Sequence, residues 1–289
     1  MMGKAACRGA GTIVNAIASG RGAAFGLSLE TDVRADLAPR DGDVSVVSDH
    51  GGEGLLAGCV RRAAVAVGLG GVTGRVEVAS EIPVSRGLKS SSAVSNAAVL
   101  SALRSLGRDL PDDAVLSIGV DESIRAGVTV TGAFDDAAAC FHGGVVVTDN
   151  RRRKILRSDR LPDGLTAVIL VPSKKIPKDE VDAERFVSRA DEFEEAVGLA
   201  LRGEFAEAIR LNSMLCAEVL ELSDEAAEAA RASGAYAAGI TGTGPATLVL
   251  CTSSEVDAVA EALRRFEGDI ITAGLNHTCS REVVPRLLS

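Results

Sequence analysis

Aromatic side chains are scarce in this 289-residue sequence, which has no Trp, one Tyr and seven Phe. Proteins that bind single-stranded nucleic acid use such rings as stacking platforms. Basic residues are also outnumbered, and the formal net charge is -9 at pH 7. Because nucleic-acid and anionic-membrane surfaces are bound by a basic face, we expect neither as a partner. A phosphorylated ligand would need donors concentrated at one place.

Clustered cysteines and long hydrophobic runs are absent as well. No Cys-x-x-Cys pair and no histidine at ligand spacing occurs, so neither a disulfide framework nor a cysteine metal site is expected. No run reaches the roughly 18 apolar residues of a membrane span, and the N-terminal segment has no sustained apolar stretch. We therefore expect a soluble cytoplasmic protein with buried, reduced thiols. The six cysteines are Cys7, Cys59, Cys140, Cys216, Cys251 and Cys279.

The hydrophobic pattern of the first half predicts strands followed by helices. Short alternating runs separated by glycines predict half-buried strands and turns over residues 4–47. Helical spacing predicts a helix over 53–67, and period-two spacing predicts a strand over 74–82. Further helices are predicted over 92–106, from Pro111 onward, and in "TGAFDDAAACFHGG". The basic run 151–154 is interpreted as a solvated turn and a plausible lobe boundary.

The second half has a different pattern. It predicts a buried strand at "LTAVILVP", charged amphipathic helices over 179–230, and two strands joined by a glycine turn at "AYAAGITGTGPATLVLC". A helix at "SEVDAVAEALRRFEG" and a last strand region at "DIITAGLNHTCSREV" follow. This order is that of a split βαβ sandwich. We therefore predict an α+β chain with lobes spanning 1–155 and 156–289.

A serine-rich loop lies between a predicted strand and a predicted helix. The stretch "IPVSRGLKSSSAVSNAAVLSAL", residues 82–103, places three consecutive serines beside Lys89 and close to Gly87. Backbone N–H groups at a helix start can converge on a phosphate, with the hydroxyls and the lysine adding further contacts. A plain cluster of helix-capping serines explains the same residues equally well.

Two other stretches contain groups suited to chemistry. Asp135 and Asp136 are adjacent carboxylates at a predicted helix start, where an aspartate can also serve simply as a cap. "GITGTGPATLVL", residues 239–250, is a glycine turn between strands, which ordinary hairpin chemistry also explains. The histidines are interpreted as structural or exposed: His50, His142 and His277.

The order and spacing of these stretches resemble those of the signature motifs of a known superfamily. The arrangement P-x-x-x-G-L-x-S-S-S, residues 83–92, is similar to the second signature of the GHMP kinases, which include galactokinases, homoserine kinases and mevalonate kinases. No Walker A motif occurs. "GAGTIVNAIASGRGAAFGLSLET" resembles the first signature and "GITGTGPATLVL" the third. The resemblance implies a two-lobed kinase fold, with an N-terminal lobe like a ribosomal-protein fold and a ferredoxin-like C-terminal lobe.

Within this superfamily, "SRGLKSSSA" (residues 85–93) and "VTVTGAFDDA" (residues 128–137) resemble the archaeal type of shikimate kinase, which carries a lysine where most relatives have glycine. The resemblance implies ATP- and Mg²⁺-dependent phosphorylation of shikimate to shikimate 3-phosphate, a step toward aromatic amino acids. Three alternatives stay open. They are homoserine kinase or another small-molecule kinase of the superfamily, a catalytically silent metabolite-sensing relative, and an RNA-binding module, which the low pI disfavours.

The resemblance also implies roles for single residues. Asp135 would lie beside the acceptor hydroxyl and accept or orient its proton, with Asp136 as the capping neighbour. Ser91 and Glu122 would hold Mg²⁺, although Glu122 could equally be an exposed helical acid. Asn15 would contact a substrate hydroxyl. The residues expected to bind ATP are Pro83, Val84, Ser85, Arg86, Gly87, Leu88, Lys89, Ser90, Ser91, Ser92 and Ala93.

Two expectations concern the walls of the pocket. Shikimate carries a carboxylate, which favours an arginine able to make a two-pronged contact. The resemblance also places the third glycine turn against the phosphate loop, where Gly242 and Gly244 would permit close backbone packing. The oligomeric state is not indicated by the sequence. The candidate arginines are Arg8, Arg21, Arg86 and Arg189.

Overall fold

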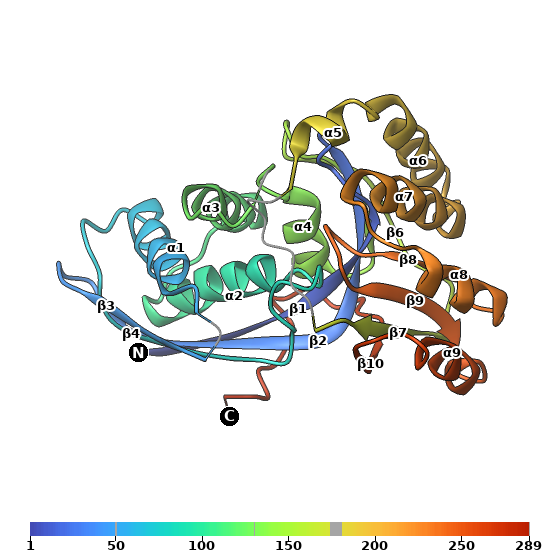
Figure 1. Cartoon of the computed structure of the whole chain (residues 1–289). Helices are drawn as coiled ribbons and strands as arrows, with labels where there is room; N and C mark the ends of the chain where they lie inside the picture. Colours follow the sequence, from blue (N-terminus) through green and yellow to red (C-terminus); the bar gives the residue numbers. More distant parts are fainter. Residues whose placement is uncertain (50, 130, 174–180, 289) are drawn as a thin grey trace.

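Two β-sheets organise the chain, and helices pack against both of them (Figure 1). This computed structural model describes residues 1–49, 51–129, 131–173 and 181–288. Within these ranges no helix combines the length and apolar character needed to cross a bilayer. The mixture of sheets and helices confirms the predicted α+β class.

The first sheet is built on one long strand. Its members are β1 (Met2–Val14), β2 (Arg21–Ala38), β3 (Val44–Ser48), β4 (Thr73–Ser80), β5 (Val145–Asp149) and β6 (Lys154–Asp159). The 18-residue β2 pairs antiparallel with β1, β4 and β5, while β3 and β6 lie at the edges. The strands predicted over 4–47 and 74–82 are thereby confirmed.

Helices α1 (Glu53–Ala66), α2 (Ser90–Ser105) and α4 (Phe134–His142) pack against the first sheet, and α3 (Asp112–Arg125) packs on these helices. Their positions confirm the predicted helices, although α2 begins at Ser90, two residues before the predicted start. Small residues on β1 and β2 allow close packing of α2 and α4, because an added Cβ at Gly3 would meet the Ser101 carbonyl oxygen at 2.2 Å.

The second sheet has the strand order β10-β7-β9-β8, with every pair antiparallel. Its strands are β7 (Leu165–Val171), β8 (Ala237–Ile240), β9 (Thr247–Thr252) and β10 (Asp269–Gly274). Its helices are α5 (Ala183–Val187), α6 (Ala190–Arg202), α7 (Phe205–Leu220), α8 (Glu225–Ala232) and α9 (Val256–Leu263). The element order confirms the split βαβ prediction, of which residues 179 and 180 lie outside the described ranges.

Alternate side chains of β7 pack into two different hydrophobic clusters. Val168 and Leu170 pack in a small cluster with residues of α8 and α9, whereas Ala167 and Ile169 belong to the large core shared with the first sheet. Since successive side chains of a strand face opposite sides, the second sheet buries both of its faces. The cleft described below therefore lies between halves that share a core.

The boundary expected between residues 155 and 156 would cut β6, which pairs with β5 in the first sheet. The next strand, β7, begins at Leu165 and belongs to the second sheet. The C-terminal segment after β10 returns to the first sheet. There the Asn276 N–H donates to the Gly26 carbonyl at 2.9 Å, and Lys4 Nζ donates to the Leu288 carbonyl at 2.9 Å.

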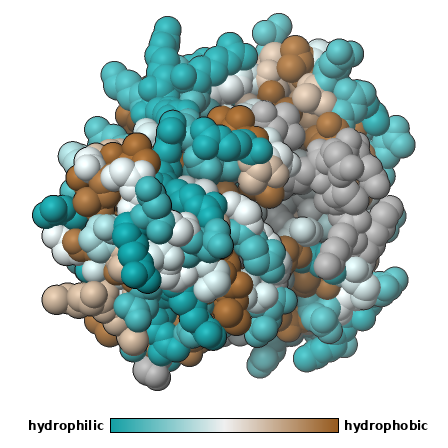
Figure 2. All heavy atoms as spheres, turned by 90° about the vertical axis from the view of Figure 1, so that its left-hand side faces the viewer, coloured by the Kyte–Doolittle hydropathy of each residue, from teal (hydrophilic) through white to brown (hydrophobic). Residues whose placement is uncertain are grey.

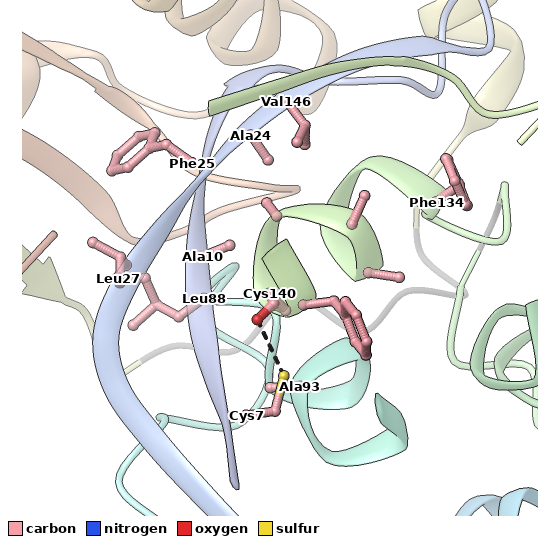
Figure 3. Packing of buried hydrophobic residues seen from close by; sticks show 14 of the residues in the cluster. Cys7, Ala10, Ala24, Phe25, Leu27, Leu88, Ala93, Phe134, Cys140 and Val146 are labelled. Atoms are coloured by element: carbon pink, nitrogen blue, oxygen red, sulfur yellow. Dashed lines mark hydrogen bonds between the residues drawn. The ribbon is translucent and has the colours of Figure 1, made fainter. Parts of the chain in front are cut away.

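The core beneath α4 contacts the C-terminal part of this helix. Figure 3 shows Cys7 on β1 directed at the Cys140 carbonyl of α4, a hydrogen bond of 3.2 Å among buried aliphatic side chains. Burial raises the pKa of the Cys7 thiol to about 11, so the thiol stays protonated and able to donate. Five of the six cysteines are buried, whereas Cys279 is only partly buried, which corrects the expectation for that residue.

The face formed around α1 and β3 is largely hydrophilic, and its hydrophobic atoms form separate small patches (Figure 2). Val47 and Val65 are among its exposed apolar side chains. Scattered residues of this kind are ordinary on a protein surface. The basic run predicted as a solvated turn lies between β5 and β6 and exposes Arg151 and Arg152.

Candidate functional site

A polar cavity of about 110 Å³ lies where the three glycine-rich stretches meet. Its wall is formed by the loop before α2, the start of α4, the end of β1 and the turn between β8 and β9. Hydroxyl, amide, carboxylate and ammonium groups all face it. The lining residues are Thr12, Asn15, Ala16, Ile17, Pro83, Ser85, Gly87, Leu88, Lys89, Ser90, Ser91, Ser92, Thr129, Thr131, Ala133, Asp135, Asp136, Gly242, Thr243 and Gly244.

The serine triplet forms the first turn of α2. Lys89 is the N-cap residue, and no acidic side chain occupies the first turn. The first N–H groups of a helix lack intrahelical acceptors and, with the helix dipole, favour an anion. Ser90, Ser91 and Ser92 line the cavity at this helix end, so the loop offers both backbone and hydroxyl donors to a phosphate.

Backbone strain is concentrated around the cavity. Ser85, Lys89 and Ala133 have φ values of 58°, 65° and 48°, in the left-handed region that non-glycine residues rarely adopt. All three line the cavity. Such conformations cost free energy and gather at functional sites. Glycine would adopt the φ of Lys89 without strain.

The three stretches are hydrogen-bonded to one another. The Thr12 hydroxyl of β1 accepts from the Gly242 N–H at 2.8 Å, and the Thr241 hydroxyl accepts from the Thr12 N–H at 3.1 Å. The Thr241 hydroxyl in turn donates to the Gly87 carbonyl at 2.9 Å. A single network therefore ties the first stretch, the phosphate loop and the third turn together.

Close backbone contact at this junction requires glycine. A Cβ added at Gly87 would meet the Thr241 carbonyl oxygen at 2.0 Å, and one added at Gly242 would meet Gly87 Cα at 2.9 Å. Both residues also have positive φ values. The expected packing of the third turn on the phosphate loop is thus present in the structure. Gly244 lines the cavity with a φ of 70°.

Lys89 is a buried cation, and its side chain is 7% exposed. Its Nζ lies 2.9 Å from Asp136 Oδ1. Burial alone would lower the pKa of Lys89, but the carboxylates of Asp136 and Asp135 outweigh it, so the pKa is raised and the ammonium stays charged. Asp136, expected to be a helix cap, lies within the first turn of α4, whose N-cap residue is Ala133, and its carboxylate pairs with Lys89.

Asp135 is held in place by a buried amide. Asn150 Nδ2 donates to Asp135 Oδ1 at 2.7 Å, and Asn150 Oδ1 accepts from the Asp135 N–H at 3.1 Å. The Thr148 hydroxyl donates to the same Asn150 oxygen at 2.7 Å, which fixes the amide orientation. On the other side, an added Cβ at Gly22 would meet Asp135 Oδ2 at 2.4 Å. The carboxylate therefore has one defined orientation.

The environment of Asp135 tunes its protonation. The residue is 4% exposed, and burial, followed by the charge of Asp136, raises its pKa to about 7. Lys89 and the hydrogen bond from Asn150 act in the opposite direction and limit the rise. A carboxylate with a pKa near neutrality can accept a proton from a hydroxyl far better than an ordinary surface aspartate.

Glu122 is buried at 4% exposure, so the alternative of an exposed helical acid is wrong. Its Oε2 faces Gly58, where an added Cβ would lie at 2.3 Å. Its Oε1 makes no hydrogen bond, although Arg125 Nη1 lies 3.0 Å away at ion-pair distance. Glu122 does not line the cavity that contains Ser91.

A short chain of contacts connects Glu122 with Ser91. The Ser95 hydroxyl donates to the Ser91 carbonyl at 2.8 Å, and Ser95 also contacts Cys59, which lies within electrostatic reach of Glu122. The buried Glu122 carboxylate, whose Oε1 is paired with Arg125, and the Ser91 hydroxyl are oxygen donors of the kind that Mg²⁺ prefers. These residues therefore fit the expected ion.

Asn15 lines the cavity, but both ends of its amide already have partners. Its Nδ2 donates to the Gly242 carbonyl at 3.0 Å, and its Oδ1 accepts from the Ile17 N–H at 2.9 Å. The backbone N–H of Asn15 donates to Asn212 Oδ1 at 2.8 Å. The evident role of Asn15 is to connect β1 with the third turn, and a contact with a substrate hydroxyl remains a proposal.

None of the candidate arginines is among the described residues that line the cavity. Arg8 contacts Asn276 and Glu30, Arg21 pairs with Glu194, Arg86 donates to the Ser173 carbonyl, and Arg189 pairs with Glu192 and Glu218. In that part of the chain, Lys89 is the one cation in the cavity wall.

A second cavity of about 360 Å³ adjoins the first and shares Ser85, Ser90 and Ser91 with it. Aliphatic side chains predominate among its larger residues, and hydroxyls and glycine backbone complete the wall. This combination suits a flat, largely apolar ring attached to a phosphate. The aliphatic residues are Leu55, Val78, Val84, Val94 and Val128.

Sequence reasoning missed four polar residues of this region, namely Thr12, Thr148, Asn150 and Thr241. Thr12 and Thr241 lie inside the quoted signatures, so their hydroxyls were visible but carried no distinguishing pattern. Asn150 follows Asp135 by 15 positions, and only the return of the chain through β5 brings the two together. Of the other predictions, Val130 and His50 lie outside the described residues.

Comparisons with known proteins agree with this geometry. The model described as "GHMP kinases N terminal domain" matches residues 55–144, and "GHMP kinases C terminal" matches residues 193–269. Relatives of similar length share more than a third of their residues with the chain. The chain belongs to the GHMP kinase family, which confirms the resemblance seen in its motifs.

Two relatives named shikimate kinase illustrate the similarity. The protein from Methanothrix thermoacetophila is 39% identical over 97% of this chain and 96% of its own length. The protein from Pyrococcus furiosus is 36% identical over 91% of this chain and 95% of its own length. The chain is thus similar to both along nearly their whole lengths.

Solved structures show the same fold. A homoserine kinase from Cytophaga hutchinsonii superposes with a TM-score of 0.74 at 17% identity, covering 96% of both chains. A galactokinase from Lactococcus lactis gives 0.77 at 14% identity, covering 96% of this chain and 94% of its own. At these identities the likeness concerns the fold alone.

Proposed function

We propose that this chain transfers the γ-phosphoryl group of ATP to a hydroxyl of shikimate, which yields shikimate 3-phosphate. The observation that carries the proposal is the combination of nearly full-length similarity to proteins named shikimate kinase with a buried carboxylate, Asp135, in the same cavity wall as the serine-rich start of α2. The proposed step belongs to the route toward aromatic amino acids.

The nucleotide would lie across both cavities. The triphosphate would meet the N–H groups and hydroxyls at the start of α2, and the nucleoside would enter the apolar second cavity. Support comes from the residues that both cavities share, which place a phosphate-binding helix end next to an apolar wall. Lys89 would supply positive charge to oxygens at the reacting end.

Asp135 would act on the acceptor hydroxyl. With a pKa of about 7, it is partly ionised at neutral pH and can take up the hydroxyl proton as the phosphoryl group transfers. Asn150 would keep Asp135 Oδ1 in a fixed direction and so hold the carboxylate in one orientation for the reaction. Positioning of this kind is a large part of phosphoryl-transfer catalysis, because little covalent chemistry falls to the protein.

Ser91 and Glu122 would hold the magnesium ion that accompanies ATP. When bound, the ion neutralises charge on the phosphate oxygens. The proposal is supported by the burial of the Glu122 carboxylate and by the position of Ser91 in the wall that both cavities share.

The acceptor would occupy the polar end of the first cavity. Thr12, Thr129 and Thr131 line this cavity together with Asn15 and Asp135. A polyhydroxylated ring matches such a wall better than an apolar acceptor does, because each substrate hydroxyl needs a partner once buried.

The test is an ADP-release assay with purified protein, ATP and Mg²⁺, run in parallel on shikimate, homoserine and mevalonate. We expect shikimate to be turned over fastest, with a product identified as the 3-phosphate by ³¹P NMR and mass spectrometry. Faster turnover of either competitor would assign the chain to another activity of the family. Binding of ATP without turnover of any acceptor would instead favour a silent, sensing relative.

A further inference from the structure

A second group of metal-ligating side chains lies away from the cavity. Asp112 is the first residue of α3, His142 is the last residue of α4, and Cys279 follows β10 in the C-terminal segment. Each offers one ligand atom, and these atoms all lie within 4.8 Å of one another. The three side chains are only partly buried, so an ion has access from solvent.

The backbone around this group is already held in position. The Ser280 N–H donates to the Phe141 carbonyl at 2.7 Å, so the residues next to Cys279 and His142 are hydrogen-bonded to each other. The Ser280 hydroxyl donates to the Cys140 carbonyl at 3.1 Å. These bonds anchor the C-terminal segment to the end of α4, which brings the thiol and the imidazole together without an ion.

Asp112 is fixed by a neighbour of Cys279. Arg281 Nε donates to Asp112 Oδ1 at 2.6 Å, which leaves the other carboxylate oxygen available. A carboxylate that binds a metal is ordinarily hydrogen-bonded by an outer partner of this type. The ring of His142 packs edge-on against Phe141, with centroids 5.0 Å apart, and this contact restricts its orientation.

We propose that Asp112, His142 and Cys279 bind a divalent transition-metal ion of the zinc type, which fastens the C-terminal segment to α3 and α4. Donor atoms of a tetrahedral zinc site lie roughly 3.3 to 3.8 Å apart, given metal–ligand bonds of about 2.0 to 2.3 Å. Since the donor atoms lie within 4.8 Å of one another, the group has to contract by at most about 1.5 Å. Three protein ligands leave the fourth position to water.

The types of ligand atom in this group favour particular metal ions. A thiolate, an imidazole and a carboxylate together suit Zn²⁺ or Co²⁺, whereas Mg²⁺ takes oxygen ligands and keeps its waters. The site is therefore independent of the magnesium proposed to accompany ATP. The C-terminal segment also makes hydrogen bonds to β1 and β2. An ion at this position therefore stabilises the folded kinase by tightening contacts that already exist.

Cobalt titration tests the site without nucleotide or shikimate. Protein freed of metal is titrated with Co²⁺, and we expect one equivalent to bind with the thiolate-to-cobalt charge-transfer absorption. Cys279→Ser should abolish that absorption, and His142→Gln should weaken Co²⁺ binding by at least about 10-fold. Zn²⁺ should displace the cobalt, and excess Mg²⁺ should leave it bound.

Matched controls come from the same segments. Asp113→Asn changes the exposed acid beside Asp112, and His277→Gln changes the exposed histidine two positions before Cys279, so both variants should bind Co²⁺ like the parent. Zn²⁺ should raise the melting temperature of the parent and of both controls, but not that of Cys279→Ser. Absence of the charge-transfer band in the parent, or its persistence in Cys279→Ser, overturns the proposal. If Cys279→Ser fails to fold, the titration of His142→Gln decides.

Discussion

Replacing Asp135 by Asn should increase the stability of the protein while removing most of its activity. The substitution keeps the size of the side chain, and its carbonyl can still accept from Asn150. It removes a negative charge at a position that is 4% exposed and beside Asp136. The two effects have one origin, because the burial that raises the pKa of Asp135 also makes its ionised form costly.

The pKa of Asp135 gives the size of the expected change in stability. It rises from 3.8 to about 7 on folding, and each unit corresponds to about 1.4 kcal/mol. Because the folded-state pKa lies above the unfolded value, the contribution to stability is present below pH 3.8 and is lost as the pH rises through about 7. At pH 8 the ionised carboxylate costs up to about 4 kcal/mol. Asp135→Asn should then melt roughly 5 °C or more above the parent, with no gain near pH 4.

Melting curves between pH 4 and pH 8, with turnover and ATP binding measured on the same preparations, test this prediction. The turnover number should fall at least about 100-fold, and the affinity for ATP should change little. Asp136→Asn is the matched control, because it breaks the 2.9 Å ion pair with Lys89 and should lower the melting temperature instead. Equal melting temperatures of Asp135→Asn and the parent at pH 8, or a nearly unaltered rate, would refute the reasoning.

Three further predictions concern the surrounding residues. Lys89→Gly removes a strained φ of 65° and also the cation that limits the rise in the pKa of Asp135. The rise of kcat/KM with pH should therefore move above pH 7. An unchanged pH profile would contradict this prediction. Asn150→Ala removes the donor to Asp135 Oδ1. The kcat should therefore fall about 10-fold or more, while the KM for ATP stays constant. A kcat equal to that of the parent would show that Asn150 does not position Asp135. Ser91→Ala and Glu122→Gln should each raise the Mg²⁺ concentration needed for half-maximal activity, and an unchanged metal dependence would exclude them as ligands.

The fold was accessible from the sequence because its elements are long and periodic. The helix predicted over 53–67 became α1, and the order strand, helices, two strands, helix, strand became the sheet order β10-β7-β9-β8. The point at which the chain passes from one sheet to the other was harder to predict. The basic turn at 151–154 signalled the end of β5, but the strand that follows still belongs to the first sheet, so the division between sheets lies further along the chain.

The candidate site was accessible where a motif keeps its residues close in sequence. The serine triplet, Lys89 and the two aspartates do line one cavity. Partners that depend on the path of the chain were not accessible. Asn150 reaches Asp135 only because β5 runs back along β2, and the burial of Glu122 depends on the packing of α3 against α1. The group around Cys279 was not indicated either, because its candidate partners come from α3 and α4, far from it in the sequence.

The most direct test of the account is the rate of ADP release with shikimate, compared with the rates with homoserine and mevalonate at saturating ATP and Mg²⁺. The account predicts turnover of shikimate above both competitors, formation of shikimate 3-phosphate, and loss of this turnover in Asp135→Asn. No ADP release on adding shikimate, or faster release with a competitor, would contradict it.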